Sequence, residues 1–363
     1  MMVRGRLAVL LVCCVLLSGC TAMLNRPYEV VTPHEYHAGQ GSGVPDASTY
    51  QALVNDIFSF VEDGVEQGQI RLTNYTSKTG DVAGDLSAAC SEVANEDPLG
   101  AYAVDFIKSD YTRVVKYYEV TITISYKRSP EQIKSLVNVT GSSAIREELR
   151  EALRNFQSEA ALRVSYFSED QDYIASLIRQ AYYDTPEAAL GMPEFTITLY
   201  PQQASSGPRI VEILLTYPED VQTLRTRSQT LQHQAISLLT ESYSTSGGWT
   251  PGTIVQLVHE QAAYEPTGGS SAYDALINGV ADSEGIALAC LLLTQQAELE
   301  ATLVQGTLDG VPHMWVIAQQ ADGSWRHMDA TRADAVLYSD SQMSELGYEW
   351  DREEYPACED PTR

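Results

Sequence analysis

Residues 282–331 read DSEGIALACLLLTQQAELEATLVQGTLDGVPHMWVIAQQADGSWRHMDAT, and this stretch decides the fold of the C-terminal third. Apolar residues fill nearly every position of 286–293, which is typical of a helix buried on all sides. Two Asp-Gly pairs, beginning at Asp309 and Asp322, then separate β-type runs and indicate an antiparallel meander. The stretch therefore predicts a core helix packed on an antiparallel sheet.

Alternation along two of these strands brings a histidine close to a carboxylate. Side chains alternate between the faces of a strand, so His313 shares a face with Trp315, and Asp329 shares one with Trp325. A short hairpin loop places His313 and Asp329 within a residue or two of register. A histidine oriented by a carboxylate at the start of a buried helix is the geometry of a catalytic triad. The candidate nucleophile at that helix start is Ser283.

Three segments of this region resemble the motifs of the bacterial transglutaminase-like family, within the papain-like cysteine proteinase superfamily. They are 271–289 (SAYDALINGVADSEGIALA), 312–316 (PHMWV) and 324–331 (SWRHMDAT). The ending 339–358 (SDSQMSELGYEWDREEYPAC) resembles that of secreted members. The resemblance implies an α+β domain of this type, which we expect to begin at a glycine-containing break and to occupy residues 244–363.

The resemblance assigns the nucleophile position to residue 283, the base to His313 and the orienting carboxylate to Asp329. Glu284 and Gly285 match the polar residue and the glycine that follow the nucleophile in the family, and both are expected to line the cleft. The family nucleophile is a cysteine, whereas position 283 is Ser. A helix N-terminus beside an imidazolium lowers a thiol pKa from ~8.5 to ~3.5–7.5, but the same surroundings do not ionise an alcohol near neutrality. This departure predicts an inactive or much weakened site.

Other residues near these positions have plainer interpretations. Trp315 and Trp325 are predicted to line the cleft, as wall packing more than as stacking surfaces. His327 is predicted to point at the rim of the same cleft. A metal site that joins His327 to His313 lacks a third ligand, so we expect neither a metal nor a cofactor.

The cysteines do not supply the missing thiol. Cys290 follows Ser283 by seven residues, about two helical turns deeper, where a cysteine is normally inert packing. Cys90 and Cys358 are candidates for a disulfide in an oxidising compartment, although no spacing rule favours that pair.

The middle of the chain, residues 49–243, has a pattern of duplication. Each of four segments combines a β-type run with a terminal tyrosine, and the tyrosines are 51, 40 and 51 residues apart. This spacing predicts two tandem β-α-β-β-α copies with a period of 91 residues. The four segments are 70–75, 120–126, 161–166 and 212–217, with further strands expected at 104–107 and 195–199.

The N-terminus has the pattern of a targeting signal. Two arginines precede a short apolar run in residues 1–19, and the run is too short to cross the ~30 Å of a bilayer core. The sequence LSGC ending at Cys20 resembles the bacterial lipobox, which implies a lipidated Cys20; an ordinary secretory signal is the alternative. Residues 20–48 are then expected to form a flexible tether. The predicted localisation is extracytoplasmic, with lipid anchoring to the bacterial cell membrane.

Charge narrows the choice of partners. The chain has 23 Lys+Arg against 49 Asp+Glu, a formal net charge of −26, which excludes a nucleic-acid partner because no basic surface exists to neutralise phosphates. The favoured hypothesis is a lipid-anchored envelope protein that binds a peptide or cell-wall fragment without turning it over. The alternative is an acyl-transfer enzyme or amide hydrolase that uses Ser283 as nucleophile.

Overall fold

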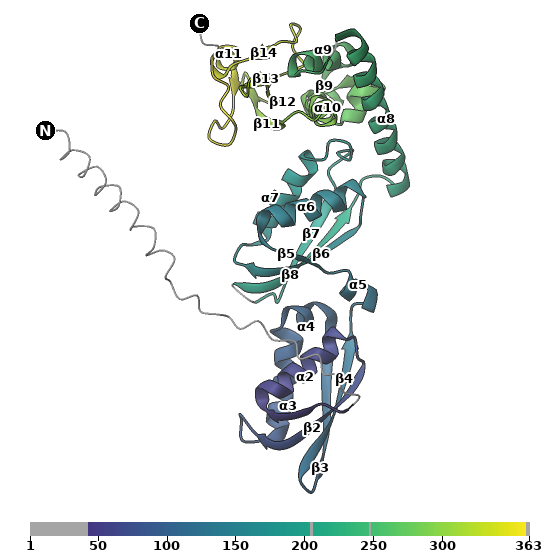
Figure 1. Cartoon of the computed structure of the whole chain (residues 1–363), viewed down its shortest axis with the longest axis vertical. Coiled ribbons are helices and arrows are strands. Elements are labelled where there is room, and N and C mark those ends of the chain that lie inside the picture. Colours follow the sequence, from purple (N-terminus) through teal and green to yellow (C-terminus); the bar gives the residue numbers. More distant parts are fainter. Residues whose placement is uncertain (1–42, 204–205, 247, 361–363) are drawn as a thin grey trace, which may run out of the picture. The chain divides into compact units, whose positions relative to one another are not determined.

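The computed structural model describes residues 43–203, 206–246 and 248–360 (Figure 1). The chain divides into a unit Met1–Val44 and a unit Pro45–Arg363. The predicted signal peptide, Cys20 and most of the predicted tether lie outside the described residues. The expected tether, residues 20–48, is too long at its C-terminal end, because strand β1 already begins at Asp46. Within the described part of the chain, none of the helices combines the length and the apolar character that crossing a bilayer requires.

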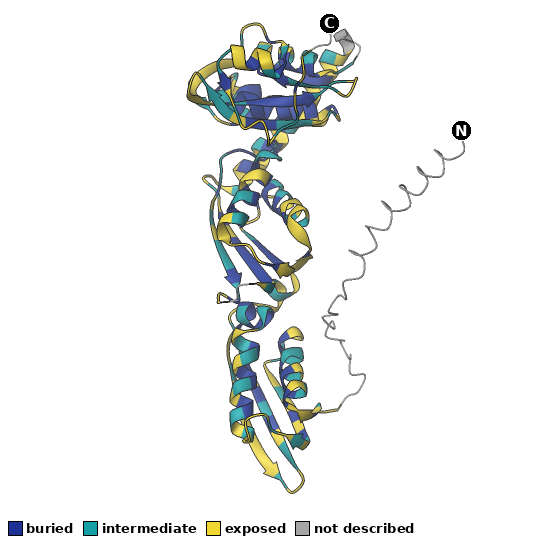
Figure 2. Cartoon of the chain, turned by 90° about the vertical axis from the view of Figure 1, so that its left-hand side faces the viewer, coloured by how far each residue is buried: buried dark blue, intermediate teal, exposed yellow. Residues whose placement is uncertain are grey.

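The first module is a four-stranded sheet in the order β1-β2-β4-β3. Strands β1 and β2 are parallel, and the other neighbours are antiparallel. Helices α2 and α3 cover one face, where Leu53, Ile57 and Ile122 are fully buried (Figures 1 and 2). The elements are β1 (Asp46–Thr49), α2 (Tyr50–Glu62), β2 (Gln67–Thr76), α3 (Val82–Asn95), α4 (Pro98–Ala103), β3 (Val104–Val114) and β4 (Tyr117–Tyr126).

The second module repeats this topology. Its sheet has the order β5-β6-β8-β7, again with the first pair parallel and the others antiparallel. Strand β5 begins at Val137, 91 residues after Asp46 (137 − 46). Helix α5 (Pro130–Lys134) lies between the modules in the sequence. The elements are β5 (Val137–Val139), α6 (Gly141–Arg154), β6 (Glu159–Phe167), α7 (Gln171–Tyr183), β7 (Glu194–Tyr200) and β8 (Gly207–Thr216).

From β6 the elements follow the order β-α-β-β-α that the sequence predicts, and from β2 they follow it with one further helix, α4, before β3. The sequence pattern missed β1 and β5, the short strands of four and three residues that open each module. Duplication of one ancestral module stays a prediction.

The C-terminal part is built around helix α10 (Ser283–Gln296) and a five-stranded antiparallel sheet in the order β14-β13-β12-β11-β15. Asp309 and Gly310 have φ of 51° and 77°, which is the two-residue turn expected of an Asp-Gly hairpin. The elements before α10 are α8 (Val221–Ser246), α9 (Pro251–Gln261), β9 (Ala263–Gly269), η1 (Asp274–Asn278) and β10 (Val280–Ala281). Those after it are β11 (Ala301–Leu308), β12 (Val311–Gln319), β13 (Trp325–Met328), β14 (Leu337–Tyr338), α11 (Asp340–Glu345) and β15 (Tyr348–Glu349).

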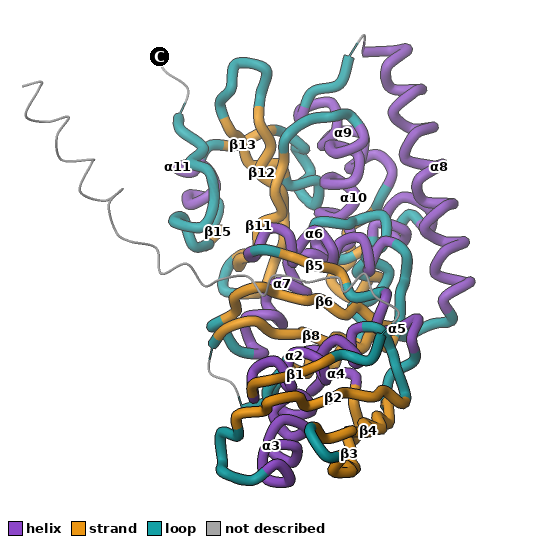
Figure 3. Tube along the Cα trace, turned by 60° about the horizontal axis from the view of Figure 1, so that its bottom comes forward, coloured by secondary structure: helices purple, strands orange, loops and turns teal. Residues whose placement is uncertain are grey.

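The two faces of β12 pack against different partners. Val316 and Ala318 belong to the same apolar cluster as α10, which lies beside the strand (Figure 3). Trp315 and Ile317 face the other way and pack with Tyr348 and other residues of the C-terminal segment. The segment after β13 therefore supplies both edge strands of the sheet, β14 and β15, and also covers its second face.

The buried core does not stop at the predicted domain boundary, residue 244. One apolar cluster includes Leu231 and Leu238 of α8 together with Ile286 and Leu293 of α10. Helix α8 thus contributes its apolar side chains to the packing around the helix that carries Ser283.

Candidate active site

Helix α10 places Ser283 at its first position. The carboxylate of Asp282 caps the helix by accepting the backbone N–H of Gly285 at 2.9 Å. A Cβ atom at position 285 would lie 2.7 Å from the carbonyl oxygen of Gly269 and 2.9 Å from that of Ser271. Only glycine permits this approach, so Gly285 seats the start of α10 directly against the preceding loop and fixes the place of Ser283.

The structure brings His313 and Asp329 together. Nε2 of His313 lies 2.8 Å from Oδ2 of Asp329, and the two residues are 4% and 1% exposed. The register of β12 and β13 pairs Ile317 with His327. Continued beyond Met328, this register places Asp329 across from Trp315, two residues from His313. That offset agrees with the spacing read from the sequence.

Three donors hold the Asp329 carboxylate. Besides His313, the hydroxyl of Tyr348 donates to Oδ2 at 2.6 Å and the backbone N–H of Thr331 donates to Oδ1 at 2.9 Å. Burial by itself raises the pKa of Asp329, but the hydrogen bonds and charge of His313, with the bonds from Tyr348 and Thr331, outweigh burial and hold that pKa below its usual range. Asp329 is therefore an anion that can orient the imidazole.

The carboxylate also fixes the tautomer of His313. A carboxylate only accepts hydrogen bonds, so the imidazole proton is on Nε2 and the lone pair is on Nδ1. Within the described residues, Nδ1 has no hydrogen-bond partner. This is the state in which a histidine can accept a proton from a nucleophile.

Ser283 does not complete the triad. Its Oγ accepts the backbone N–H of Met314 at 3.4 Å, and no hydrogen bond joins Ser283 to His313 in the described structure. The serine therefore contacts the backbone of the residue that follows His313 on β12, and not the imidazole. The three residues predicted to act together thus divide into a tight pair and a separate serine.

Cys290 is not a substitute nucleophile. It is fully buried, and burial followed by the charge of Asp329 raises the pKa of its thiol. Cys90 and Cys358, whose pairing the sequence left open, are both free and belong to separate apolar clusters. Burial raises the pKa of both thiols, that of Cys358 to about 12.

The prediction that His327 points at the rim of the cleft is wrong, because this residue is fully buried. The indole N–H of Trp315 donates to Nδ1 of His327 at 2.8 Å, and Nε2 faces Oδ1 of Asp340 at 2.8 Å. Trp315 is 0% exposed, so it does not line a cleft and instead packs 6.4 Å behind the His313 ring. Trp325 is half-buried and packs against the same cluster.

His327, Asp340 and Cys358 offer three potential ligand atoms within 4.8 Å of one another. The Trp315 N–H occupies Nδ1 of His327, so in the neutral ring the proton must be on Nε2, the atom that a metal would need. Burial lowers the pKa of His327 and outweighs the Asp340 carboxylate, which favours this neutral form. The cluster is therefore best described as a hydrogen-bonded tie between the sheet and α11.

Glu284 stands apart from the triad positions. Its side chain does not approach His313 but borders a pocket beside the helix start. Burial, with a contribution from Asp282, raises the pKa of Glu284 to about 7. This carboxyl therefore changes charge near neutrality, which no sequence pattern indicated.

Comparisons with solved structures give distant likenesses. A protein described as a TGase is 16% identical over 66% of this chain and 68% of that chain, with a TM-score of 0.27. A candidate cysteine protease from Cytophaga hutchinsonii is 14% identical over 44% and 68%, with a TM-score of 0.24, and menin is 16% identical over 53% and 36%, with a TM-score of 0.23. No protein-family model and no curated protein matches the chain. Any assignment of chemistry must therefore come from the residues of the site.

Proposed function

We propose that the C-terminal part is a transglutaminase-like binding domain whose triad positions are retained without an effective nucleophile. One observation supports this most directly. The His313–Asp329 pair is buried and complete, while Ser283 bonds to the Met314 backbone instead of His313. The arrangement keeps the shape of a catalytic site but lacks the contact that would activate the oxygen.

The charge next to Ser283 also disfavours catalysis by this residue. Asp282 directly precedes the serine and its carboxylate caps the same helix start, so an anion forming on Oγ would lie beside a negative charge. An alcohol also needs its proton removed during the reaction, whereas a thiol in this position would already be ionised. Both effects raise the barrier to acyl transfer, and we propose that the domain holds a peptide or cell-wall fragment without cleaving it.

We further propose that the protein works at the outer side of a bacterial membrane, anchored through Cys20. The support is the sequence pattern of residues 1–20 alone. Cys20→Ala in the full chain should move the protein from the membrane fraction to the soluble fraction and abolish incorporation of a fatty-acid label. Unchanged fractionation and labelling would contradict the anchor.

A second candidate function is acyl transfer or amide hydrolysis through Ser283. The observation that favours it is the His313 tautomer, which leaves Nδ1 ready to take a proton. Hydrogen bonds to a catalytic base are often longer in free enzymes and shorten when substrate binds. In this hypothesis His313 is the base and Asp329 orients it.

One experiment separates the two functions. The purified protein is incubated with an amine donor and glutamine peptides, beside Ser283→Ala and Ser283→Cys, and product is measured by mass spectrometry. For the binding domain we expect no turnover by wild type or Ser283→Ala, and turnover by Ser283→Cys that is lost in Ser283→Cys/His313→Ala. Turnover by wild type that Ser283→Ala abolishes would overturn the binding-only function and establish the second one.

A further inference from the structure

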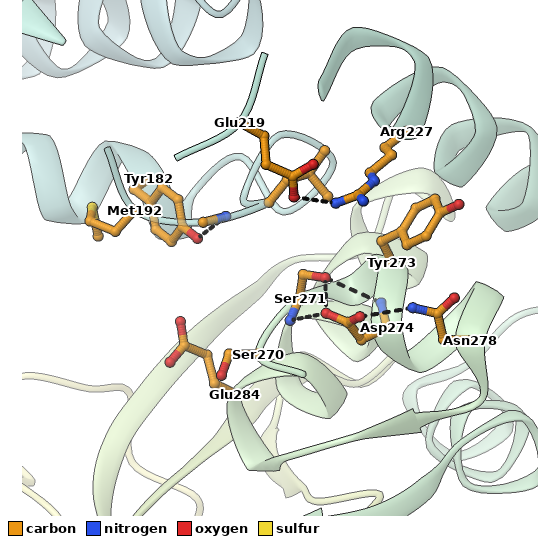
Figure 4. Close-up of a pocket in the computed structure, with 12 residues that line it drawn as sticks. Tyr182, Met192, Glu219, Arg227, Ser270, Ser271, Tyr273, Asp274, Asn278 and Glu284 are labelled. Carbon is orange, nitrogen blue, oxygen red and sulfur yellow. Dashed lines mark hydrogen bonds and ion pairs between the residues drawn. The ribbon is translucent and has the colours of Figure 1, made fainter. Parts of the chain in front are cut away.

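A pocket of about 490 Å³ adjoins the N-terminus of α10. Its volume lies in the range of small-ligand sites, roughly 300–1,000 Å³. The second module, α8, the loop before η1, and α10 all contribute to the wall (Figure 4). The lining residues that matter here are Tyr182, Glu219, Arg227, Asp274 and Glu284.

The pocket has more acid than base. Arg227 is already paired with Glu219 at 2.5 Å and lies 5.6 Å from the centre of the Tyr273 ring. Asp274 accepts hydrogen bonds from two neutral side chains, Ser271 and Asn278. Neither Asp274 nor Glu284 forms an ion pair with a Lys or Arg of the described residues. The pocket therefore presents two carboxyl groups that lack a cationic partner.

Glu284 is the carboxyl group that a cation would change most. It is partly withdrawn from water and has Asp282 two positions away, and these two effects raise its pKa to about 7. A cation in the pocket would offset both and keep Glu284 ionised.

A buried hydroxyl in the same wall has an unused donor. Tyr182 is 4% exposed, and its oxygen accepts the backbone N–H of Gly191 at 3.1 Å. Among the described residues, no acceptor is found for its own O–H proton. Figure 4 shows the hydroxyl end of the ring facing the space between Glu219 and Glu284. A buried donor of this kind favours a ligand oxygen as its partner.

We propose that this pocket binds the cationic side chain of a basic residue in a peptide ligand, with Glu284 and Asp274 facing the cation and Tyr182 donating to a peptide carbonyl oxygen. Because Glu284 follows Ser283 directly on α10, the pocket adjoins the helix start that carries the candidate nucleophile. The inference rests on the proposed peptide-binding function and adds the chemical class of one ligand residue.

The test measures binding of blocked single residues to the full chain by calorimetry or NMR titration. The probes are the Nα-acetyl amides of lysine, arginine and norleucine, of which norleucine is the neutral counterpart of lysine. We expect one or both cationic probes to bind at least about tenfold more tightly than norleucine. Comparison of lysine with arginine shows whether the site prefers an ammonium or a guanidinium.

The variants assign the effect to residues. Glu284→Gln should remove about tenfold of the affinity for the cationic probes and leave norleucine unchanged. Glu300→Gln is the control, since it removes one exposed carboxylate beyond the far end of α10 and should change nothing. Tyr182→Phe should weaken all probes by about three- to tenfold, because each carries the same carbonyl oxygens.

The outcomes separate this inference from the proposed function, using longer mixed-sequence peptides in parallel. Peptide binding that is indifferent to charge and to Glu284→Gln overturns the pocket assignment and leaves the binding function in place. Binding of the lysine probe that depends on Glu284, with no binding of longer peptides, supports the pocket and overturns the peptide-binding function. If neither the blocked residues nor the longer peptides bind, the pocket assignment and the peptide-binding function are both overturned.

Discussion

The hydroxyl of Tyr348 donates to Oδ2 of Asp329 at 2.6 Å, the same oxygen that lies 2.8 Å from Nε2 of His313. Tyr348 is in the C-terminal segment, and the ring of Trp315 packs edge-on against it at 5.2 Å. The candidate site is therefore built from three parts of the chain: the start of α10, the β12–β13 hairpin and the segment that covers the sheet. Removing that segment would take a donor from the carboxylate that orients His313.

We expect Tyr348→Phe to lower the free energy of unfolding by about 1.5–3 kcal/mol, the range for a hydrogen bond to a charged group. The ring stays in place, so packing is largely preserved and the loss reports the hydroxyl. Urea unfolding at neutral pH measures it. Tyr355→Phe is the matched control, since within the described residues the Tyr355 hydroxyl has one long hydrogen bond, accepted from the backbone N–H of Gln305 at 3.4 Å. This variant should cost less than about 0.5 kcal/mol. Equal losses in the two variants would contradict the special role of Tyr348.

The sequence predicted the hairpin and the pairing of His313 with Asp329 because both depend on local rules. An Asp-Gly turn fixes the register, and period-two alternation fixes which side chains share a face. These rules do not reveal what covers a face. His327 shares its face with Asp329 as expected, yet the C-terminal segment covers that face and buries His327 against Trp315. Tyr348 was missed for the same reason, since only a tertiary contact brings it to Asp329.

In the two modules the sequence pattern reveals the long strands but not the short ones. The 91-residue spacing was readable because the long strands β2 and β6, and β4 and β8, each end near a tyrosine. Strands of three or four residues such as β1 and β5 are too short to display alternation. The Glu284 pocket was equally out of reach, because α7, α8 and α10 contribute to it from distant positions and no single motif contains it.

An introduced thiol should report whether His313 reaches position 283. In Ser283→Cys we expect iodoacetamide to react with the new thiol near neutral pH, with an apparent pKa below the ~8.5 of a free cysteine. The buried Cys90, Cys290 and Cys358, whose thiol pKa values are all raised, should stay unmodified until the protein unfolds. Peptide mapping by mass spectrometry distinguishes the sites. If Ser283→Cys/His313→Ala reacts at the same rate, His313 does not act on this position.

Glu284 should make the protein less stable as pH rises. Its pKa is 4.5 unperturbed and about 7 in the folded chain, so between these values the folded state keeps a proton that the unfolded state has released. Stability falls as pH rises through this window and does not recover above it. Glu284→Gln has no carboxyl group at this position and so lacks this loss. After allowance for the partial exposure of Glu284, the variant should be more stable than wild type by about 1 kcal/mol near pH 8 and by almost nothing near pH 4. A constant difference at all pH values would contradict the raised pKa.

His327 should have the opposite pH dependence. Burial lowers its pKa, and protonation of Nδ1 would break the bond from the Trp315 indole. Below the unfolded pKa of about 6.5 the unfolded chain takes up a proton that the folded chain refuses, so stability is lost as pH falls.

Two substitutions of His327 test its hydrogen bonds to Trp315 and Asp340 separately. His327→Asn keeps an acceptor near the Trp315 N–H and gives up the link to Asp340, while His327→Gln keeps a donor toward Asp340 and leaves the indole N–H without an acceptor. Each should cost about 2–4 kcal/mol at neutral pH, because a buried polar group loses its partner. Neither variant titrates here, so the difference from wild type should shrink by about 1 kcal/mol between about pH 7.5 and about pH 5.5 in urea unfolding. A difference that stays constant over this range would mean that His327 titrates equally in both states, and the neutral hydrogen-bonded tie would be wrong.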